Sequence, residues 1–178
     1  FENMFASGTR TNRGLLASLC SFPSLPGRAI TKLYGYPHPF SSISNILNER
    51  GYDSYLVYGG DLSFDNIGGF FRAEGFKNLI GVEDFSSNLV LNKWGVADHN
   101  VFERANDEFK KCGGNPFLGV ILTSSNHEPY KVPDKRFEIF PDSMPFHEYL
   151  NTFYYSDWAL GHFFHLAERE SYFKNTIF

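Results

Sequence analysis

A polar turn, Gly-Thr-Arg-Thr-Asn-Arg-Gly, occupies residues 8–14 between two apolar segments. The apolar residues after it, 15–19, are typical of a helix, so the turn would lie at a helix N-terminus. The unpaired N–H groups and the dipole of a helix favour an anion at that end. A hydroxyl among such donors is what a phosphate site needs. Taken alone, these seven residues favour a simpler interpretation, in which Thr11 caps the helix and the arginines are solvated.

Two further polar clusters follow predicted buried strands. Residues 59–66 come directly after the apolar run 55–58, and residues 124–127 follow the apolar run 117–122. Ligands of open α/β sheets bind beyond the carboxyl ends of the strands. The turn at 8–14 also follows an apolar segment. One such cluster is ordinary, but three together predict a ligand site.

Each candidate side chain in these clusters also has a simpler structural interpretation. Asp61 could cap a helix, Asn66 could hold a turn, and His127 alone is more typical of a structural histidine than of a catalytic one. Trp94 precedes a helix predicted over 98–112, so it is more plausibly an anchor for that helix than a substrate platform. An aromatic ring beside a site can serve both purposes.

The apolar periodicity predicts helices that alternate with buried strands, which indicates an α/β fold with a mainly parallel sheet flanked by helices. The predicted helices are one that follows the turn and ends before Pro23, and those at 41–50, 64–74, 98–112 and 150–169. The predicted strands are 1–6, 55–58, 117–122 and the first half of a strand at 176–178.

Some details of these elements are predicted as well. The run 117–122 is apolar on both faces, so we expect it to be a central strand. Asp98 is expected to cap the helix that starts with it. Segment 76–97 gives no clear pattern. Segment 128–146 contains four prolines and is typical of a long loop, which is often functional.

Length and composition limit the class of protein. The 178 residues are 42% hydrophobic and 20% charged, which suits one globular domain or part of one. The net charge of −4 argues against nucleic-acid binding, because that affinity rests on many Lys and Arg side chains. The two cysteines fit neither a metal motif nor a disulfide framework. Both ends interrupt apolar segments, so we expect a chain truncated at both ends.

Five motifs in order carry a resemblance to a known family. The chain resembles the extracytoplasmic catalytic domain of the lipoteichoic acid synthase and sulfatase-like family, in the alkaline phosphatase superfamily. The match covers residues 1–178 and implies a single, incomplete sulfatase-like domain. The motifs are GTRTNRG at 8–14, CSFPSLPGR at 20–28, YGGDLSFDN at 58–66, WGVAD at 94–98 and TSSNHEPY at 123–130.

The resemblance implies roles for individual residues. Thr11 aligns with the nucleophilic threonine, which in the family binds a divalent metal and attacks phosphorus. His127 aligns with a histidine that contacts the phosphoryl or leaving-group oxygen. Asp61 and Asn66 fall in the loop that lines the head-group pocket, and Trp94 is assigned to substrate binding beside them.

Arg13 is assigned to substrate binding from its position and chemistry, because it follows the predicted nucleophile closely enough to hold a phosphate oxygen. Some synthases carry a tryptophan and an arginine around the position of residues 64–66. This chain has Phe-Asp-Asn there, which leaves the exact substrate open.

The implied activity is transfer of a phosphoglycerol-like head group from a phospholipid, through a phosphothreonine, to a glycan or polyol acceptor or to water. The implied cofactor is a divalent metal, Mn²⁺ first, with Mg²⁺ or Zn²⁺ as alternatives. The implied parent protein is membrane-anchored and acts on the extracytoplasmic face of a bacterial membrane. In the family, a carboxylate upstream of residue 1 and an Asp-His pair beyond residue 178 complete the metal site. Thr11 is thus the only metal ligand carried over, and we expect the chain alone to be inactive.

Three alternatives stay open. Phosphoethanolamine transfer also uses a metal-bound threonine. Sulfuric ester hydrolysis needs a Cys/Ser-x-Pro-x-Arg motif, but the proline at 23 comes one place too late after Cys20, and no arginine follows it at the required spacing. A non-catalytic domain that binds glycan or lipid head groups is the alternative from another class.

Overall fold

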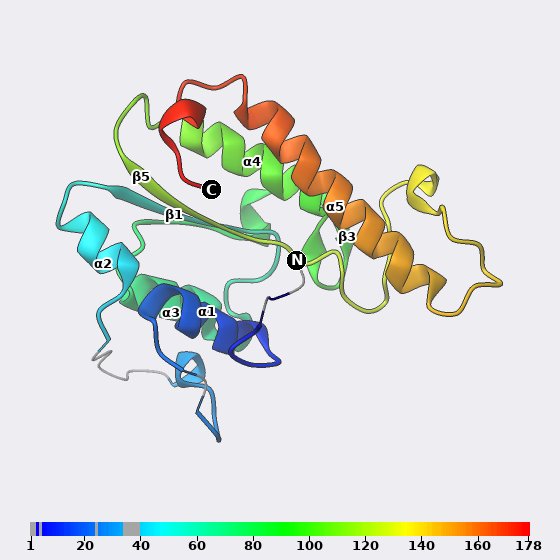
Figure 1. Ribbon diagram of the computed structural model, residues 1–178, viewed down its shortest axis with the longest axis horizontal. Helices are drawn as coiled ribbons and strands as arrows, with labels where there is room; N and C mark the ends of the chain where they lie inside the picture. The colour runs from blue at the N-terminus through cyan, green and yellow to red at the C-terminus, as the bar shows by residue number, and fades with distance from the viewer. Residues whose placement is uncertain (1–2, 4, 24, 34–39) are drawn as a thin grey trace.

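The computed structural model describes residues 3, 5–23, 25–33 and 40–178. A three-stranded parallel sheet lies between two layers of helices (Figure 1). Its strands are β1 (Asp53–Tyr58), β2 (Asn78–Ile80) and β5 (Phe117–Leu122), in the order β2-β1-β5. The predicted α/β fold with a parallel sheet flanked by helices is confirmed.

The pairing of β1 with β5 sets the position of the site. The two strands are in register from Asp53 opposite Phe117 to Tyr58 opposite Leu122, so their carboxyl ends coincide. The polar segments that follow these strands therefore leave the same edge of the sheet.

The prediction that residues 117–122 form a central strand is wrong for the described sheet. There β1 is the middle strand and β5 borders it. An apolar pattern on both faces of a strand predicts that helices cover both faces. It does not predict which strands pair with its two edges.

Three helices cover one face of the sheet (Figure 1): α1 (Thr11–Cys20), α2 (Ile43–Asn48) and α3 (Ile67–Ala73). The predicted helices before Pro23 and within 41–50 are confirmed. Ser42 caps α2, because its Oγ accepts the Asn45 N–H at 3.2 Å. The core of this layer is formed by buried leucine, isoleucine, tyrosine and phenylalanine side chains: Leu16, Leu19, Leu56, Tyr58, Ile67, Phe70, Phe71 and Phe76.

Helices α4 (Asp98–Lys110) and α5 (His147–Ala167) cover the other face. They confirm the helices predicted at 98–112 and 150–169, although α5 begins a little earlier. The prediction that Asp98 caps α4 is wrong: Ala97 is the N-cap residue, and Asp98 is the first residue inside the helix. Its carboxylate instead accepts hydrogen bonds from the backbone after β5.

The helix predicted over 64–74 is interrupted at its start. A 3₁₀ turn covers Phe64–Asn66, with Asp65 and Asn66 at φ values of 52° and 58°, and α3 begins only at Ile67. Asp and Asn tolerate this left-handed conformation better than most residues. Contacts with residues 31 and 32 hold both side chains, so tertiary structure overrides the local helical pattern.

The segment 76–97 contains three short strands that the sequence pattern did not reveal. Besides β2, these are β3 (Val90–Asn92) and β4 (Gly95–Val96), which pair antiparallel. Strands of two or three residues are too short for a recognisable alternation. The predicted loop 128–146 contains only a 3₁₀ turn, Lys135–Phe137. The other 3₁₀ turns are Ile30–Lys32, Val82–Asp84, Ser87–Leu89 and Phe173–Asn175.

The two terminal strand predictions have different outcomes. Residues 1, 2 and 4 of the segment 1–6 lie outside the described residues, and residues 5 and 6 belong to no strand. Residues 176–178 also form no strand, and Ile177 is fully exposed. No helix in the described part of the chain is both long and apolar enough to cross a bilayer.

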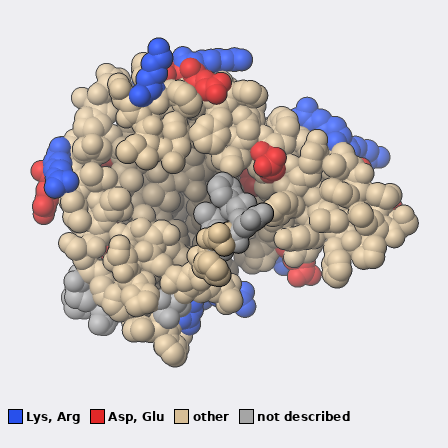
Figure 2. Space-filling view, viewed as in Figure 1, with Lys and Arg blue, Asp and Glu red and all other residues tan. Residues whose placement is uncertain are grey.

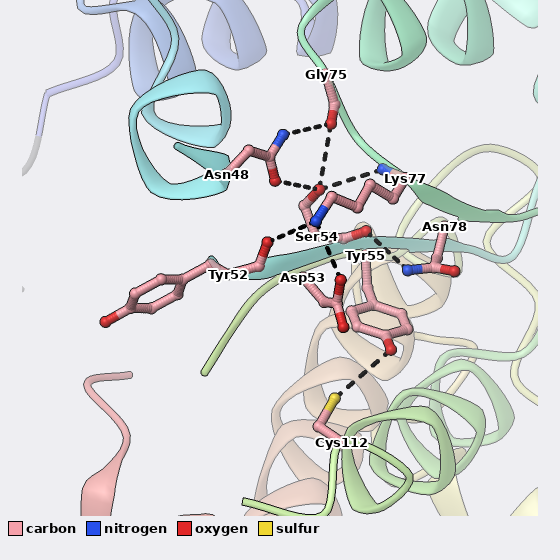
Figure 3. Close-up of polar contacts among 9 residues, drawn as sticks. All are labelled: Asn48, Tyr52, Asp53, Ser54, Tyr55, Gly75, Lys77, Asn78 and Cys112. Carbon is pink, nitrogen blue, oxygen red and sulfur yellow. Dashed lines mark hydrogen bonds and ion pairs between the residues drawn. The ribbon is translucent and has the colours of Figure 1, made fainter. Parts of the chain in front are cut away.

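A polar network fixes the amino end of β1, at the opposite end from the polar loops (Figure 3). Ser54 Oγ lies 3.2 Å from Asn48 Oδ1 and 3.3 Å from the Gly75 carbonyl oxygen, and it accepts the Lys77 N–H at 3.1 Å. Lys77 Nζ also pairs with the Asp53 carboxylate at 3.1 Å. These bonds join α2, β1 and the residues just before β2 at the end of the sheet opposite the polar loops.

Candidate functional site

A cavity of about 150 Å³ lies where the start of α1 meets the segments that follow β1 and β5. It brings together three of the six predicted site residues: Thr11, Trp94 and His127. The lining residues are Arg10, Thr11, Asn12, Tyr58, Phe64, Asp65, Ile67, Trp94, Leu122, Thr123, Ser124 and His127. The polar clusters of the sequence thus converge on one cavity.

Thr11 is the first residue of α1, and Arg10 before it is the N-cap residue in an extended conformation. The Arg10 carbonyl accepts the N–H groups of Arg13 and Gly14 at 3.0 and 3.2 Å, which closes the first turn of the helix. Thr11 is exposed to solvent. Its hydroxyl is therefore carried at the positive end of a helix dipole, in the wall of the cavity.

Asn12 and Asp65 join α1 to the turn before α3, and sequence reasoning missed both. The Asn12 Nδ2 donates to Asp65 Oδ2 at 3.0 Å, and Lys32 Nζ pairs with Asp65 Oδ1 at 2.6 Å. Both carboxylate oxygens are thus engaged, and Lys32 balances the negative charge. The only sequence signal was the departure from the family pattern at residues 64–66.

Trp94 and His127 form one wall of the cavity. Their ring centroids are 3.8 Å apart, and Trp94 Nε1 donates to the Glu128 carbonyl oxygen at 2.5 Å. The ring of Phe64 meets Trp94 edge-on at 5.6 Å. His127 is exposed, so its imidazole is open to a molecule in the cavity.

A close approach of two backbone segments places Trp94. The Val96 N–H donates to the Gly59 carbonyl oxygen at 2.9 Å, which holds β4 against the end of β1. Gly95 has a φ of 124°, and a Cβ there would lie 1.9 Å from the same oxygen. Only glycine fits this position. Gly95 lies in the segment that the sequence left unassigned.

Asp61 lies beside the Thr11 cavity and lines an adjacent hollow of about 240 Å³ with Tyr58, Phe64, Lys93 and Trp94. The Ser63 N–H donates to Asp61 Oδ1 at 2.7 Å. Hydrogen bonds from Ser63 lower the pKa of the Asp61 carboxyl, which is therefore ionised at neutral pH. Burial, and then the charges of Asp61 and Asp65, raise the pKa of Tyr58, which stays neutral.

Asn66 and Arg13 are engaged away from the Thr11 cavity. The Asn66 Nδ2 donates to the Thr31 carbonyl oxygen at 2.8 Å. The Arg13 guanidinium donates to the carbonyl oxygens of Leu25 and Gly27, the latter at 2.7 Å. It lines a separate, much smaller cavity. The arginine that lines the Thr11 cavity is Arg10.

The donors in the described residues do not by themselves fit a divalent metal. Within that part of the chain, no group of three or more His, Cys, Asp or Glu side chains could hold one. The carboxylate that lines the cavity, Asp65, is already held by Lys32 and Asn12. Thr11 offers one further oxygen.

Charged side chains are sparse on the face seen in Figure 2. Lysine and arginine side chains lie around its rim and form no continuous patch there. This distribution agrees with the net charge of −4. Among the residues that line the Thr11 cavity, Arg10 carries a guanidinium, and Lys32 pairs with the lining residue Asp65.

The comparison with protein families decides the assignment. The profile described as Sulfatase matches residues 1–178, the whole chain. The chain belongs to the sulfatase family. Curated relatives of this sulfatase-family chain include Phosphoglycerol transferase I of Xanthomonas axonopodis pv. citri, 30% identical over 67% of this chain and 18% of the relative. The enzyme of that name in Citrobacter koseri is 25% identical over 94% of this chain and 23% of the relative. The chain thus spans about a fifth of the length of these relatives.

Solved structures agree with the family. A protein of the alkaline phosphatase superfamily from Vibrio parahaemolyticus superposes with a TM-score of 0.85 and 36% identity, over 97% of this chain and 42% of that one. The lipoteichoic acid synthase LtaP from Listeria monocytogenes gives a TM-score of 0.82 at 20% identity, over 92% of this chain and 42% of that one. The second likeness supports the fold, and the first also supports the superfamily.

Proposed function

We propose that the sulfatase-family chain forms part of a phosphotransferase that attacks a phosphate ester with Thr11. The observation that carries the proposal is the cavity that joins the Thr11 hydroxyl, at the start of α1, to the imidazole of His127. The relatives named as phosphoglycerol transferases support a phosphoglycerol-like head group as the transferred group. Sulfate esters and phosphoethanolamine are the competing substrates.

The proposed reaction has two displacements at phosphorus. In the first, a bond forms between Thr11 Oγ1 and phosphorus while the bond from phosphorus to the lipid alcohol breaks. The threonine loses its proton to solvent, and the alcohol leaves with a proton. In the second, an acceptor hydroxyl or water attacks the phosphothreonine, and Thr11 Oγ1 leaves and is reprotonated.

The side chains around Thr11 supply binding and charge. The N-terminus of α1 and the Arg10 guanidinium favour the anionic phosphoryl oxygens. His127 is assigned to the leaving-group oxygen. The aromatic surface of Trp94 and Phe64, with Asp61 beside it, is assigned to the head group and to a polyol or glycan acceptor.

We also propose a divalent metal for the complete enzyme, because enzymes of this superfamily generally use one. Mn²⁺ is the first candidate and Thr11 the only proposed ligand in this chain. A metal there would lower the pKa of the threonine hydroxyl. The steps above involve only the chain's own residues. Membrane anchoring on the extracytoplasmic face of a bacterial membrane belongs to the same proposal and rests on the family resemblance.

The test uses the natural full-length protein that carries these 178 residues. With a phosphoglycerol lipid and no added acceptor, mass spectrometry of the peptide that contains Thr11 should detect a phosphoglycerol adduct. Thr11→Ala should remove the adduct and reduce turnover by at least about a thousandfold.

Thr9→Ala is the matched control, because Thr9 is an exposed threonine in the same turn. This variant should keep the adduct on Thr11 and most of the turnover. An adduct that never forms on Thr11, under conditions where the wild type turns over, contradicts the covalent mechanism. Turnover of sulfate esters alone contradicts the proposed substrate class.

A further inference from the structure

The turn that carries His127 is tied to the rest of the protein by a buried carboxylate. Asp98 is 1% exposed and begins α4. Its Oδ1 accepts the backbone N–H of Ser124 at 3.0 Å and of Ser125 at 2.9 Å. In return, Ser125 Oγ accepts the Asp98 N–H at 3.0 Å. Asp98 lies 26 residues from Ser124 and 27 from Ser125 in the sequence, and hydrogen bonds in both directions join the start of α4 to this turn.

The second carboxylate oxygen of Asp98 is also engaged. Ser156 of α5 donates its Oγ–H to Asp98 Oδ2 at 3.2 Å. A buried carboxylate is costly unless hydrogen bonds compensate for lost solvation, and here three donors reach it. Bonds to a charged acceptor are stronger and more directional than neutral ones. The arrangement therefore fixes the orientation of two consecutive peptide planes after β5.

Two further contacts hold the same short segment. Thr152 of α5 donates its Oγ1–H to Asn126 Oδ1 at 2.9 Å. Trp94 donates to the Glu128 carbonyl oxygen and stacks on the His127 ring. Of these contacts, those of Asp98 lie nearest the point where the turn leaves β5, and they constrain main chain rather than side chains.

We propose that Asp98 is a positioning residue of the active site, which orients the turn from Ser124 to His127 so that the imidazole faces Thr11 across the cavity. This inference rests on the proposed function for the role of His127. The carboxylate does not cap its own helix: Asp98 Oδ1 accepts from Ser124, which lines the cavity, and from Ser125 next to it, while Oδ2 accepts from Ser156 of α5. It also engages the N–H groups of Ser124 and Ser125, so neither is a free amide donor for an anion in the cavity.

The first test needs no activity. Hydrogen–deuterium exchange of the full-length protein should show faster exchange in peptides covering 123–128 of Asp98→Ala, with β1 unchanged. Asp107→Ala is the matched control, because Asp107 is an exposed aspartate on the same helix. Unchanged exchange in 123–128 overturns the proposal. Faster exchange throughout the domain in both Asp98→Ala and the milder Asp98→Asn shows a role in folding only, and also overturns it.

The second test asks whether Asp98 acts through His127. We expect Asp98→Ala to lower kcat by about 10- to 100-fold and to change KM by less than about threefold. Asp98→Asn keeps one oxygen acceptor and should recover most of the loss. In a His127→Ala background, Asp98→Ala should have little further effect, because the two residues act as a unit. An equal loss in both backgrounds overturns the proposal.

The two tests separate this inference from the proposed function. If the wild type turns over no phosphate ester, the proposed function fails, while the exchange experiment still decides whether Asp98 holds the turn. If the wild type is active and exchange in 123–128 is insensitive to Asp98, the inference fails alone.

Discussion

Two arginines in the same turn have different surroundings, and we propose Arg10 rather than Arg13 as the phosphate contact. The sequence assigned this contact to Arg13, which follows Thr11 by two residues. In the structure the Arg13 guanidinium holds the carbonyl oxygens of Leu25 and Gly27, while Arg10 lines the Thr11 cavity. The sequence could not distinguish the two arginines, because the difference depends on the position of Leu25 and Gly27, whose carbonyl oxygens Arg13 contacts.

A pair of matched variants decides between them. Arg10→Gln should raise the KM for a phosphate ester by about tenfold, the worth of one charge-assisted hydrogen bond. Arg13→Gln should leave KM nearly unchanged and lower the free energy of unfolding by about 1 kcal/mol. Steady-state kinetics and urea unfolding measure the two effects. A larger KM effect for Arg13→Gln would restore the original assignment.

Some of the cavity residues could be predicted from the sequence, and others could not. Thr11 was identified at the start of a predicted helix and His127 after a predicted strand, and each matches a motif; the structure brings both to one cavity. Asn12 and Asp65 were missed, because their pairing joins positions 53 residues apart. The catalytic roles of Thr11 and His127 stay predictions.

Between elements, the packing of α4 on α5 contains a titratable group whose charge state affects stability. His99 of α4 is half-buried, and its Nδ1 lies 2.6 Å from the Tyr155 hydroxyl of α5. Burial lowers the pKa of His99, helped by His162 and Arg136 and opposed by Glu103 and Asp98. The neutral imidazole can accept the Tyr155 O–H.

We expect the free energy of unfolding to fall as pH is lowered from 7 to below 6.5. The folded pKa of His99 lies below its value of 6.5 in the unfolded chain, so the unfolded chain binds more protons in this range. The stabilisation is present above pH 6.5 and is lost as pH falls through the folded pKa. Urea unfolding of wild type and His99→Gln between pH 5.5 and 7.5 measures the difference in slope.

His165→Gln is the control, because His165 is a largely exposed histidine of α5. It should retain the wild-type slope, whereas His99→Gln should flatten it. A His99→Gln slope equal to that of the wild type contradicts the linkage. The shifts of Asp61 and Glu108 act at lower pH, since both carboxyl pKa values are lowered from below 5.

The helices and the long strands could be predicted from the sequence. The kink before α3 and the order of the strands in the sheet could not. Apolar periodicity located α1, α2, α4 and α5, and apolar runs located β1 and β5. Contacts with a distant turn hold Asp65 and Asn66 at the kink. The short strands β3 and β4 pair with each other, and a backbone hydrogen bond from Val96 to Gly59 holds β4 against the end of β1.

At the scale of the whole molecule, four separate segments of the chain build the cavity, but the described residues do not supply a set of metal ligands there. Within the described residues, Thr11 is accompanied by no group of three metal-binding side chains. We expect the 178-residue chain alone, assayed with Mn²⁺ and a phosphoglycerol lipid, to give no turnover above background.

The same assay on the full-length protein is the control, and it should show metal-dependent turnover. Isothermal titration with Mn²⁺ provides a second measure, with no saturable site expected in the chain alone. Metal-stimulated turnover by the 178 residues that disappears in Thr11→Ala would contradict this prediction.

The contact between Gly95 and Gly59 has a consequence for how such a site can diversify. A contact between the main chains of Gly95 and Gly59 positions the segment that carries Trp94. The position of this segment therefore depends little on which side chain occupies position 94. Exchanging that ring, or Phe64 opposite it, reshapes what the pocket accepts while the glycines keep the scaffold in place. Substrate preference can therefore change without moving this part of the scaffold, because its position depends on two residues that have no side chain.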